Sequence, residues 1–385
     1  MRLIILKPEP CEAAEEIRLG QVWNRLASAG LSGETDGSIF ADILQIDRAG
    51  RLRELLLLPE QLKNSRILIM AAIGDTGINL ELMAMLREIR LFPGCMDGSI
   101  GAIIVDGAGE QSTKSVGKHA AWIMNMAGCL LIGRPLTEGT GSLMNHQVMA
   151  ERWQVSRMEA YMRSAVDLLE RLLTFRRPIS RIAGSSGYGS GHKAAEGCPR
   201  ILCLHASNKK TSNTLRLWGK VRQHLPEQIA VREIALRNGE IRDCIGCHYD
   251  TCMYFSRKSS CYFGGTIVEE VYPALEECDA LVLLCPNFND AVGANLTATI
   301  NRLTALFRKT PFDRKYLFAL IVSGYSGGDI VGRQLIGALN MNKSFILPPY
   351  FALMEMANTP CSIEAVPGVN ERAAGFAEHI AAFLK

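Results

Sequence analysis

Hydroxyl and amide side chains fill the stretch Ala206–Thr214, which directly follows the apolar run Arg200–Leu204. The run is typical of a strand buried on both faces of a parallel sheet, and the residues after it predict a helix that begins near Asn213. Free N–H groups and the positive dipole end of such a helix would bind an anion in the loop. Because the loop lacks glycine, it matches neither the dinucleotide nor the Walker loop and suits a phosphate monoester. An ordinary capped helix after a strand is the alternative interpretation.

Closely spaced cysteines form a second group of residues that could bind a metal or react. Cys244, Cys247, Cys252 and Cys261 lie in one short stretch, whereas the whole chain of 385 residues has 12 cysteines. Four thiolates can hold a [4Fe–4S] cluster, and the same ligands can bind zinc. A redox-active CxxC dithiol, or surface cysteines around a dimer-forming loop, are the other interpretations. The residues alone leave these four open.

Two further polar loops follow later apolar runs of the C-terminal half. Pro286–Asp290 contains Phe288, which offers an aromatic face, and amides that can bind the edge of a flat heterocycle. Ser323–Gly328 contains glycines that allow close approach of the backbone, and Tyr325 can stack on a ligand or cap it. Each loop taken singly fits a plain polar turn. Together with the first loop, they are expected at one crevice, at the carboxyl ends of parallel strands.

Strands that alternate with helices predict α/β folding in both halves, with doubly wound parallel sheets. The expected strands of the first half are Arg2–Leu6, Ile39–Ile46, Ile67–Ile73, Ile100–Val105 and Leu130–Ile132. Those of the second half are Arg200–Leu204, Ala230–Leu236, Ala280–Cys285, Tyr316–Val322 and Ser344–Leu347. Five strands with helices between them fit a flavodoxin-like sheet in the second half.

The predicted domain organisation is an N-terminal α/β domain at 1–175, a flexible linker at 176–199, rich in glycine and serine, and a flavodoxin-like domain at 200–385. The N-terminal domain is interpreted as a degenerate flavodoxin-like domain. Its first strand ends in Lys7-Pro8-Glu9-Pro10, which has none of the features of the hydroxyl-rich loop. Packing, dimerisation or the shaping of a substrate cleft is therefore its expected role.

The C-terminal half resembles the NADPH-dependent FMN reductase family of flavodoxin-like proteins, and most closely its iron–sulfur flavoprotein branch. The resemblance covers about Arg200–Leu384 and rests on the motifs SNKKTSNT, CIGC, CPNFNDAVGANLTATINRL and SGYSGGD. It implies that the FMN phosphate is bound by Ser207, Lys209, Ser212, Asn213 and Thr214. It also implies that the isoalloxazine is lined by Pro286, Asn287, Phe288 and Asn289, with Ser323, Gly324 and Tyr325 closing the site.

Several positions depart from the family pattern. Ala206 stands where the first loop usually has glycine, Lys209 or Lys210 where it has arginine, and Phe288 where the ring loop has tyrosine. The family's compact four-cysteine motif lies at the same point of the chain but has shorter second and third gaps. The choice between NADH and NADPH is left open by these departures.

The resemblance implies an FMN-dependent NAD(P)H oxidoreductase, with a [4Fe–4S] cluster on Cys244, Cys247, Cys252 and Cys261 as an electron relay. A flavin-binding electron-transfer protein without substrate turnover of its own is the alternative. Electrons would pass to a small-molecule acceptor or to a redox partner protein, and the chain is expected to form a homo-oligomer. No catalytic residue is identified.

Composition excludes several other classes. The formal net charge is only +3, and the basic residues are scattered, which gives no support to nucleic-acid binding. No apolar run approaches the ~20 residues of a membrane span. The first residues do not fit a signal peptide, because Lys7 and Pro8 follow only a short apolar run. A cytoplasmic protein with reduced or metal-bound cysteines is therefore expected.

Overall fold

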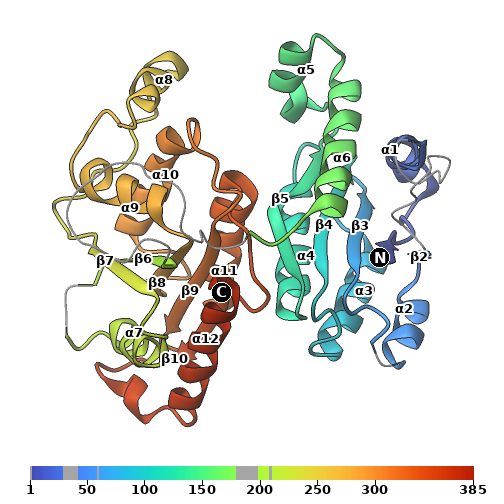
Figure 1. Cartoon of the computed structure of the whole chain (residues 1–385). Helices are drawn as coiled ribbons and strands as arrows, with labels where there is room; N and C mark the ends of the chain where they lie inside the picture. Colours follow the sequence, from blue (N-terminus) through green and yellow to red (C-terminus); the bar gives the residue numbers. More distant parts are fainter. Residues whose placement is uncertain (1, 29–41, 59, 179–197, 208–209) are drawn as a thin grey trace. The chain divides into compact units, whose positions relative to one another are not determined.

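The computed structural model describes residues 2–28, 42–58, 60–178, 198–207 and 210–385. The chain divides into two compact units, Met1–Arg176 and Arg177–Lys385. Each unit has a parallel sheet with helices packed against it (Figure 1). The predicted linker at 176–199 falls mostly on residues 179–197, which lie outside the described residues.

The N-terminal unit has a five-stranded sheet, within the described residues, in the order β2-β1-β3-β4-β5. Every strand pair is parallel. The strands are β1 (Arg2–Leu6), β2 (Asp42–Ile46), β3 (Arg66–Ile73), β4 (Ile100–Gly107) and β5 (Leu130–Gly139). The helices between and after them are η1 (Ala13–Glu16), α1 (Ile17–Leu26), α2 (Ala49–Leu56), α3 (Leu80–Leu91), α4 (Thr113–Met126), η3 (Met144–His146), α5 (Gln147–Trp153) and α6 (Arg157–Thr174).

The C-terminal unit repeats this topology, with the order β10-β9-β8-β6-β7 and parallel pairing throughout. The strands are β6 (Arg200–His205), β7 (Ala230–Ala235), β8 (Ala280–Pro286), β9 (Tyr316–Ser323) and β10 (Ala352–Met356). The helices are α7 (Asn213–His224), α8 (Tyr249–Arg257), η4 (Ile267–Val271), α9 (Tyr272–Glu277), α10 (Ala294–Phe307), α11 (Gly328–Leu335), η5 (Ile336–Met341), η6 (Ser362–Ala365) and α12 (Val369–Leu384).

Counted from its own first strand, each unit has the order 2-1-3-4-5, which is the flavodoxin-like arrangement. The prediction of two parallel α/β sheets is confirmed, and the degenerate flavodoxin-like interpretation of the first half agrees with its strand order. In such a sheet the strand order reverses at one switch point, where ligands bind at the carboxyl ends of the strands. That point lies between β1 and β3 in one unit and between β6 and β8 in the other.

Burial on both faces explains why the apolar runs form central strands. All eight residues of β4 and all eight of β9 are buried, since helices cover both sides of a parallel sheet. Such strands read as continuous apolar runs, which made them recognisable in the sequence. Among the helices of the described residues, none combines the length and the apolar character that crossing a membrane requires.

The predicted fifth strand at Ser344–Leu347 is wrong. Ile346 forms only an isolated bridge to Tyr316, whereas β10 pairs along β9 from Ala352 onward. Pro348 and Pro349 separate the two segments, and proline has no N–H to donate to a ladder. The loop that belongs to the edge of the fifth strand is therefore the one after Met356.

Candidate functional site

The carboxyl edge of the C-terminal sheet brings together the three loops that the sequence analysis selected. Their strands, β6, β8 and β9, are neighbours with a common direction. The loops after β6 and β8 flank the switch point, and the loop after β9 lies beside them. The structure adds a fourth loop, which follows β10 at the same edge.

The first loop leads into α7 as expected. Ser212 is the N-cap, and its Oγ accepts a hydrogen bond from the backbone N–H of Leu215 at 3.4 Å. The start of α7 therefore lies at the edge where a phosphate would be bound, with its N–H groups and positive dipole end. Ser207 is half-buried next to the loop. Lys209 lies outside the described residues.

Asn213 and Thr214 are engaged within the protein. The Nδ2 of Asn213 donates to the carbonyl oxygens of Ala357 at 3.0 Å and Thr359 at 2.8 Å, and its Oδ1 accepts from the N–H of Ile363 at 3.2 Å. Thr214 is buried. The structure thus places both residues beside the first loop, with the amide of Asn213 bound to the loop after β10.

His205 was missed by sequence reasoning, although a histidine at the end of an apolar strand was a visible signal. It is the last residue of β6 and is buried, and its Nε2 lies 3.5 Å from Oε1 of Glu233 on β7. The indole Nε1 of Trp218 donates to the other carboxylate oxygen at 2.9 Å. The hydrogen bond from His205 lowers the pKa of the Glu233 carboxyl, against the effect of burial. These contacts anchor the strand end from which the first loop departs.

The second loop is held by the side chain of Asn287. Its Nδ2 donates to the carbonyl oxygen of Ser326 at 2.8 Å and approaches the Oγ of Ser323 at 3.3 Å, so it joins the loops after β8 and β9. Its Oδ1 is buried and has no hydrogen-bond partner among the described residues. An unpaired buried acceptor is costly, so this atom fits a ligand that donates an N–H. Pro286 precedes it at the end of β8, and Asn289 follows with a positive φ of 51°.

Glycine lets the third loop approach the second. Gly327 has a φ of +82°, and a Cβ at this position would overlap the carboxylate of Asp290. A side chain here would therefore have a strained backbone conformation and would force the Asp290 carboxylate to move. Ser323 is buried at the end of β9, and Gly324 comes next. The two loops are therefore in direct contact, through Asn287 and Ser326, at the carboxyl edge of the sheet.

Two aromatic side chains stand exposed at this edge. Phe288 is 64% exposed and Tyr325 is 78% exposed, one from each of the loops after the neighbouring strands β8 and β9. Large exposed rings beside polar groups are typical of surfaces that bind flat ligands. The hydroxyl of Tyr325 accepts a hydrogen bond from Nδ2 of Asn358 at 2.7 Å. Asn358 belongs to the loop after β10, which sequence reasoning missed because it placed the last strand too early.

The four cysteines lie in the segment between β7 and η4. Cys244 is exposed, and Cys247, Cys252 and Cys261 are half-buried. In the part of the chain that the structure describes, no group of three or more histidine, cysteine, aspartate or glutamate residues has an arrangement that could hold a metal ion. The thiols nevertheless share one neighbourhood. Burial raises the pKa of Cys252, Arg308 opposes the rise, and the other three thiols add to it.

The cysteine segment is fixed to α10 by polar contacts. Asn301 donates to Asp243 at 3.0 Å, and Arg302 donates to the carbonyl oxygens of Arg242 at 3.3 Å and Gly264 at 2.6 Å. Within the segment, the aromatic rings of 254, 255, 262 and 263 follow one another edge to face. The segment therefore packs against α10.

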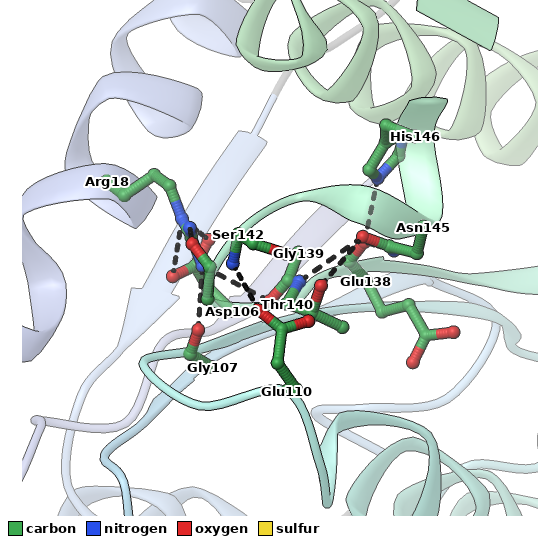
Figure 2. A network of polar contacts seen from close by, with 11 residues as sticks. Arg18, Asp106, Gly107, Glu110, Glu138, Gly139, Thr140, Ser142, Asn145 and His146 are labelled. Atoms are coloured by element: carbon green, nitrogen blue, oxygen red, sulfur yellow. Dashed lines mark hydrogen bonds and ion pairs between the residues drawn. The ribbon is translucent and has the colours of Figure 1, made fainter. Parts of the chain in front are cut away.

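The corresponding edge of the N-terminal sheet is closed by its own side chains (Figure 2). Arg18 of α1 forms an ion pair with Asp106 at 2.8 Å, at the end of β4. It also donates to the carbonyl oxygens of Gly107 at 2.7 Å, Gly139 at 3.2 Å and Gly141 at 3.0 Å. Burial raises the pKa of the Asp106 carboxyl, and Arg18 opposes that rise. One guanidinium thus joins the ends of β4 and β5.

A second set of contacts continues this network. The carbonyl oxygen of Glu138 lies 2.8 Å from Nε2 of His146 and accepts from Asn145 at 2.7 Å (Figure 2). Burial lowers the pKa of His146. The carboxylate of Glu138 accepts from Thr113 at 2.8 Å and lies 3.4 Å from Nζ of Lys114. The groups named here are thus paired with one another.

Comparison with protein families finds a match within the C-terminal unit. Residues 199–358 match the model of the NADPH-dependent FMN reductase family. These residues include the three predicted loops and the cysteine segment. The resemblance to the NADPH-dependent FMN reductase family, inferred from the sequence motifs, is therefore confirmed for residues 199–358. The search of curated proteins found no match.

Solved structures resemble about half of the chain. RosB with a bound 8-demethyl-8-formylriboflavin-5'-phosphate intermediate has 15% identity and a TM-score of 0.40, over 48% of this chain and 79% of its own. An NAD(P)H:quinone oxidoreductase from Methanothermobacter marburgensis has 17% identity and a TM-score of 0.36, over 47% and 94%. An FMN-dependent NADH-azoreductase from Bacillus anthracis, in complex with FMN, has 10% identity and a TM-score of 0.32, over 47% and 99%.

Proposed function

We propose that this protein is an FMN-dependent NAD(P)H oxidoreductase that binds FMN at the carboxyl edge of its C-terminal sheet. The observation that carries the proposal is the match of residues 199–358 to the NADPH-dependent FMN reductase family, because that range contains all three loops. When bound, FMN supplies the hydride chemistry between a nicotinamide and an acceptor, while the chain binds and orients it.

In the proposed FMN site, the phosphate lies at the start of α7. Ser212 caps this helix, and Ser207 and Lys209 lie in the loop before it. Free N–H groups at a helix start, hydroxyl donors and a lysine are suited to a phosphate monoester. Asn213 and Thr214 belong to the same set in the sequence prediction, although Asn213 already donates to two protein carbonyl oxygens.

In the proposed FMN site, the isoalloxazine ring is bound by Phe288, Tyr325 and Asn287. The two aromatic rings are exposed, and stacking on a flat heterocycle would remove them from water. The Oδ1 of Asn287 is a buried acceptor without a donor among the described residues. The N–H of the pyrimidine part of an isoalloxazine is a donor of the required kind. The residues at this edge therefore fit the flavin chemically.

Fluorescence titration tests flavin binding. Apoprotein titrated with FMN under reducing, anaerobic conditions is expected to quench the flavin emission to saturation. The variants F288A and Y325A should each weaken FMN binding about 2- to 10-fold, since a stacked aromatic pair is worth roughly 0.5–1.5 kcal/mol beyond its buried area. Tyr249→Ala, on the exposed surface of α8, is the matched control. Wild-type protein that leaves FMN fluorescence unchanged would contradict the proposal.

Turnover separates the proposed enzyme from the alternative of an electron-transfer protein. Steady-state oxidation of NADH and NADPH is measured with added FMN or a quinone as acceptor. The oxidoreductase should consume the nicotinamide at a rate proportional to enzyme concentration. Tight FMN binding without nicotinamide oxidation would instead favour a flavin-binding carrier that depends on a partner for its electrons.

The iron–sulfur part of the hypothesis rests on the four cysteines alone. Cys244, Cys247 and Cys261 lie close enough to Cys252 to add to the rise of its pKa, but the described positions of the four thiols do not form a ligand set. No electron-transfer step is therefore assigned to a cluster. Iron and sulfide analysis of protein purified without oxygen tests the ligation, and the variant C244S should lose the metal while C361S retains it. Wild-type protein free of both elements and of zinc would contradict metal binding.

Self-association is also part of the proposal, since it is implied by the family resemblance. A redox partner or small acceptor would then meet an oligomer. Light scattering of the purified chain, at concentrations above and below about 1 μM, distinguishes a stable oligomer from a monomer.

A further inference from the structure

The loop after β10 connects the two ends of the candidate site. At one end, Asn213 at the start of α7 donates to Ala357 at 3.0 Å and to Thr359 at 2.8 Å. At the other end, Asn358 donates to the hydroxyl of Tyr325 at 2.7 Å. The residues bound at the two ends are consecutive, so one short segment of backbone carries both sets of contacts.

The amide of Asn213 is used in full by these contacts. An asparagine side chain has two N–H donors and a carbonyl acceptor. Both donors are directed at carbonyl oxygens of the loop, and the acceptor receives the N–H of Ile363 at 3.2 Å. A phosphate bound at the start of α7 would have to displace one of these partners to reach this amide. The arrangement is that of a residue that holds the loop.

Asn358 in turn restrains the Tyr325 ring. The ring is 78% exposed, so little packing fixes its orientation, and the hydrogen bond at its hydroxyl is a defined anchor. A Cβ on Gly324 would lie 2.9 Å from Oδ1 of Asn358, so the side chain of Asn358 lies close against the backbone before the tyrosine. The backbone of the same loop is joined to β9 by the bond from Ala357 to Ser323 at 2.9 Å.

We propose that Asn213 and Asn358 are positioning residues for the ring end of the flavin site. Asn213 fixes the loop 357–361, and through this loop Asn358 holds Tyr325 where it stacks on the isoalloxazine. The proposal rests on flavin binding at this edge. It reassigns Asn213, which the motif alone places among the phosphate ligands.

Comparison of FMN with riboflavin tests the assignment, because riboflavin has the same ring but no phosphate. N213A and N358A should weaken the binding of both flavins by a common factor of about 3- to 10-fold, as expected for lost hydrogen bonds. S207A should weaken the binding of FMN and leave the binding of riboflavin unchanged. In the Y325F background, N358A should have no further effect, since the hydroxyl that accepts its hydrogen bond is gone. If N213A weakens FMN and spares riboflavin, Asn213 is a phosphate ligand and the inference is wrong.

Hydrogen exchange of the apoprotein tests the loop independently of any flavin. N213A should raise the exchange of the amides of Ala357 and Cys361 about tenfold, because these N–H groups bond to Ser323 and Thr211. Asn295 is the matched control, since it also lies in the first turn of a helix and donates to the carbonyl oxygen of Leu236. N295A should leave exchange in 357–361 unchanged.

The two measurements separate the possible failures. Wild-type protein that binds neither flavin overturns the proposed function, and the exchange experiment still decides whether Asn213 holds the loop. Unchanged exchange in N213A overturns the inference even if FMN binds tightly. Thermal unfolding of each apoprotein variant distinguishes a local loss at the loop from general destabilisation, which would raise exchange throughout the C-terminal unit.

Discussion

Substitution of Arg18 by methionine should strongly destabilise the N-terminal unit. The guanidinium is paired with Asp106, whose side chain is only 4% exposed, and it also donates to carbonyl oxygens at the ends of β4 and β5. Methionine retains much of the unbranched stem but leaves the buried carboxylate without its partner. Removing one member of a buried ion pair costs about 3–5 kcal/mol of unfolding free energy.

The matched control lies on the same helix. Arg25 of α1 is 3.6 Å from Glu159, and its side chain is 50% exposed. An exposed pair of this kind contributes about 0.2–1 kcal/mol, so R25M should lose far less stability than R18M. The double variant R18M/D106N removes the unpaired charge together with the arginine. It should therefore be more stable than R18M alone.

The pH dependence provides a second signature. Burial already raises the pKa of Asp106 in the folded protein, and Arg18 opposes that rise, so R18M should raise the pKa further. A carboxyl whose pKa is higher in the folded state than in the unfolded state binds protons preferentially in the folded state, and stability then increases as the pH falls. The loss of unfolding free energy in R18M should be at its full size at pH values above this raised pKa. It should become smaller as the pH falls through the pKa. In the D106N background this pH dependence should be absent.

Native-state hydrogen exchange in a urea series measures the effect within one unit, because the amides of β4 and β5 report on the N-terminal sheet. The free energies of unfolding are compared at neutral pH and at a pH near the ordinary pKa of a carboxyl group. If R18M and R25M lost equal amounts of unfolding free energy, the reasoning would be refuted. A deficit that remains constant as the pH falls would show that the unpaired carboxylate is not its cause.

Further predictions concern the C-terminal unit and the thiols. G327A should destabilise the protein by about 1–3 kcal/mol and weaken FMN binding, because a side chain would be strained at φ +82° and would overlap Asp290; urea unfolding and flavin titration measure both effects. S212A should cost about 1 kcal/mol of unfolding free energy through loss of the α7 N-cap, and an unchanged urea midpoint would contradict the capping role. Burial raises the pKa of Cys285 to about 12, so iodoacetamide at pH 8 should label exposed Cys11 and leave Cys285 unmodified until the protein is denatured, as read by mass spectrometry.

Local chemistry made much of the fold predictable. Strands such as β9 are buried along their whole length, so their sequences consist almost entirely of apolar residues. The helices between successive strands indicate a parallel sheet. The capped start of α7 is likewise local, since Ser212 bonds to a residue three positions away. The loops after β8 and β9 follow from strand order, because parallel strands end at one edge.

Partners far apart in the chain could not be read from the residues. Two apolar segments flank Pro348 and Pro349, and only the register against β9 decides that Ala352–Met356 is the fifth strand. Asn213 looked like a phosphate ligand because its motif is local, whereas its bonding partners lie 144 and 146 residues further on. Arg18 is ordinary in the helix pattern of α1, yet it binds Asp106 across 88 residues.

The sequence by itself determined the alternation of strands and helices, the two-unit organisation and the three loops of the candidate site, because burial periodicity, capping and turn chemistry act over a few residues. Only the tertiary structure decided which side chains are already paired. Hydrogen bonds and ion pairs between distant segments depend on how the sheet places its edges. That placement leaves the amide oxygen of Asn287 without a hydrogen-bond partner among the described residues of one unit, and it puts Arg18 at the edge of the other sheet.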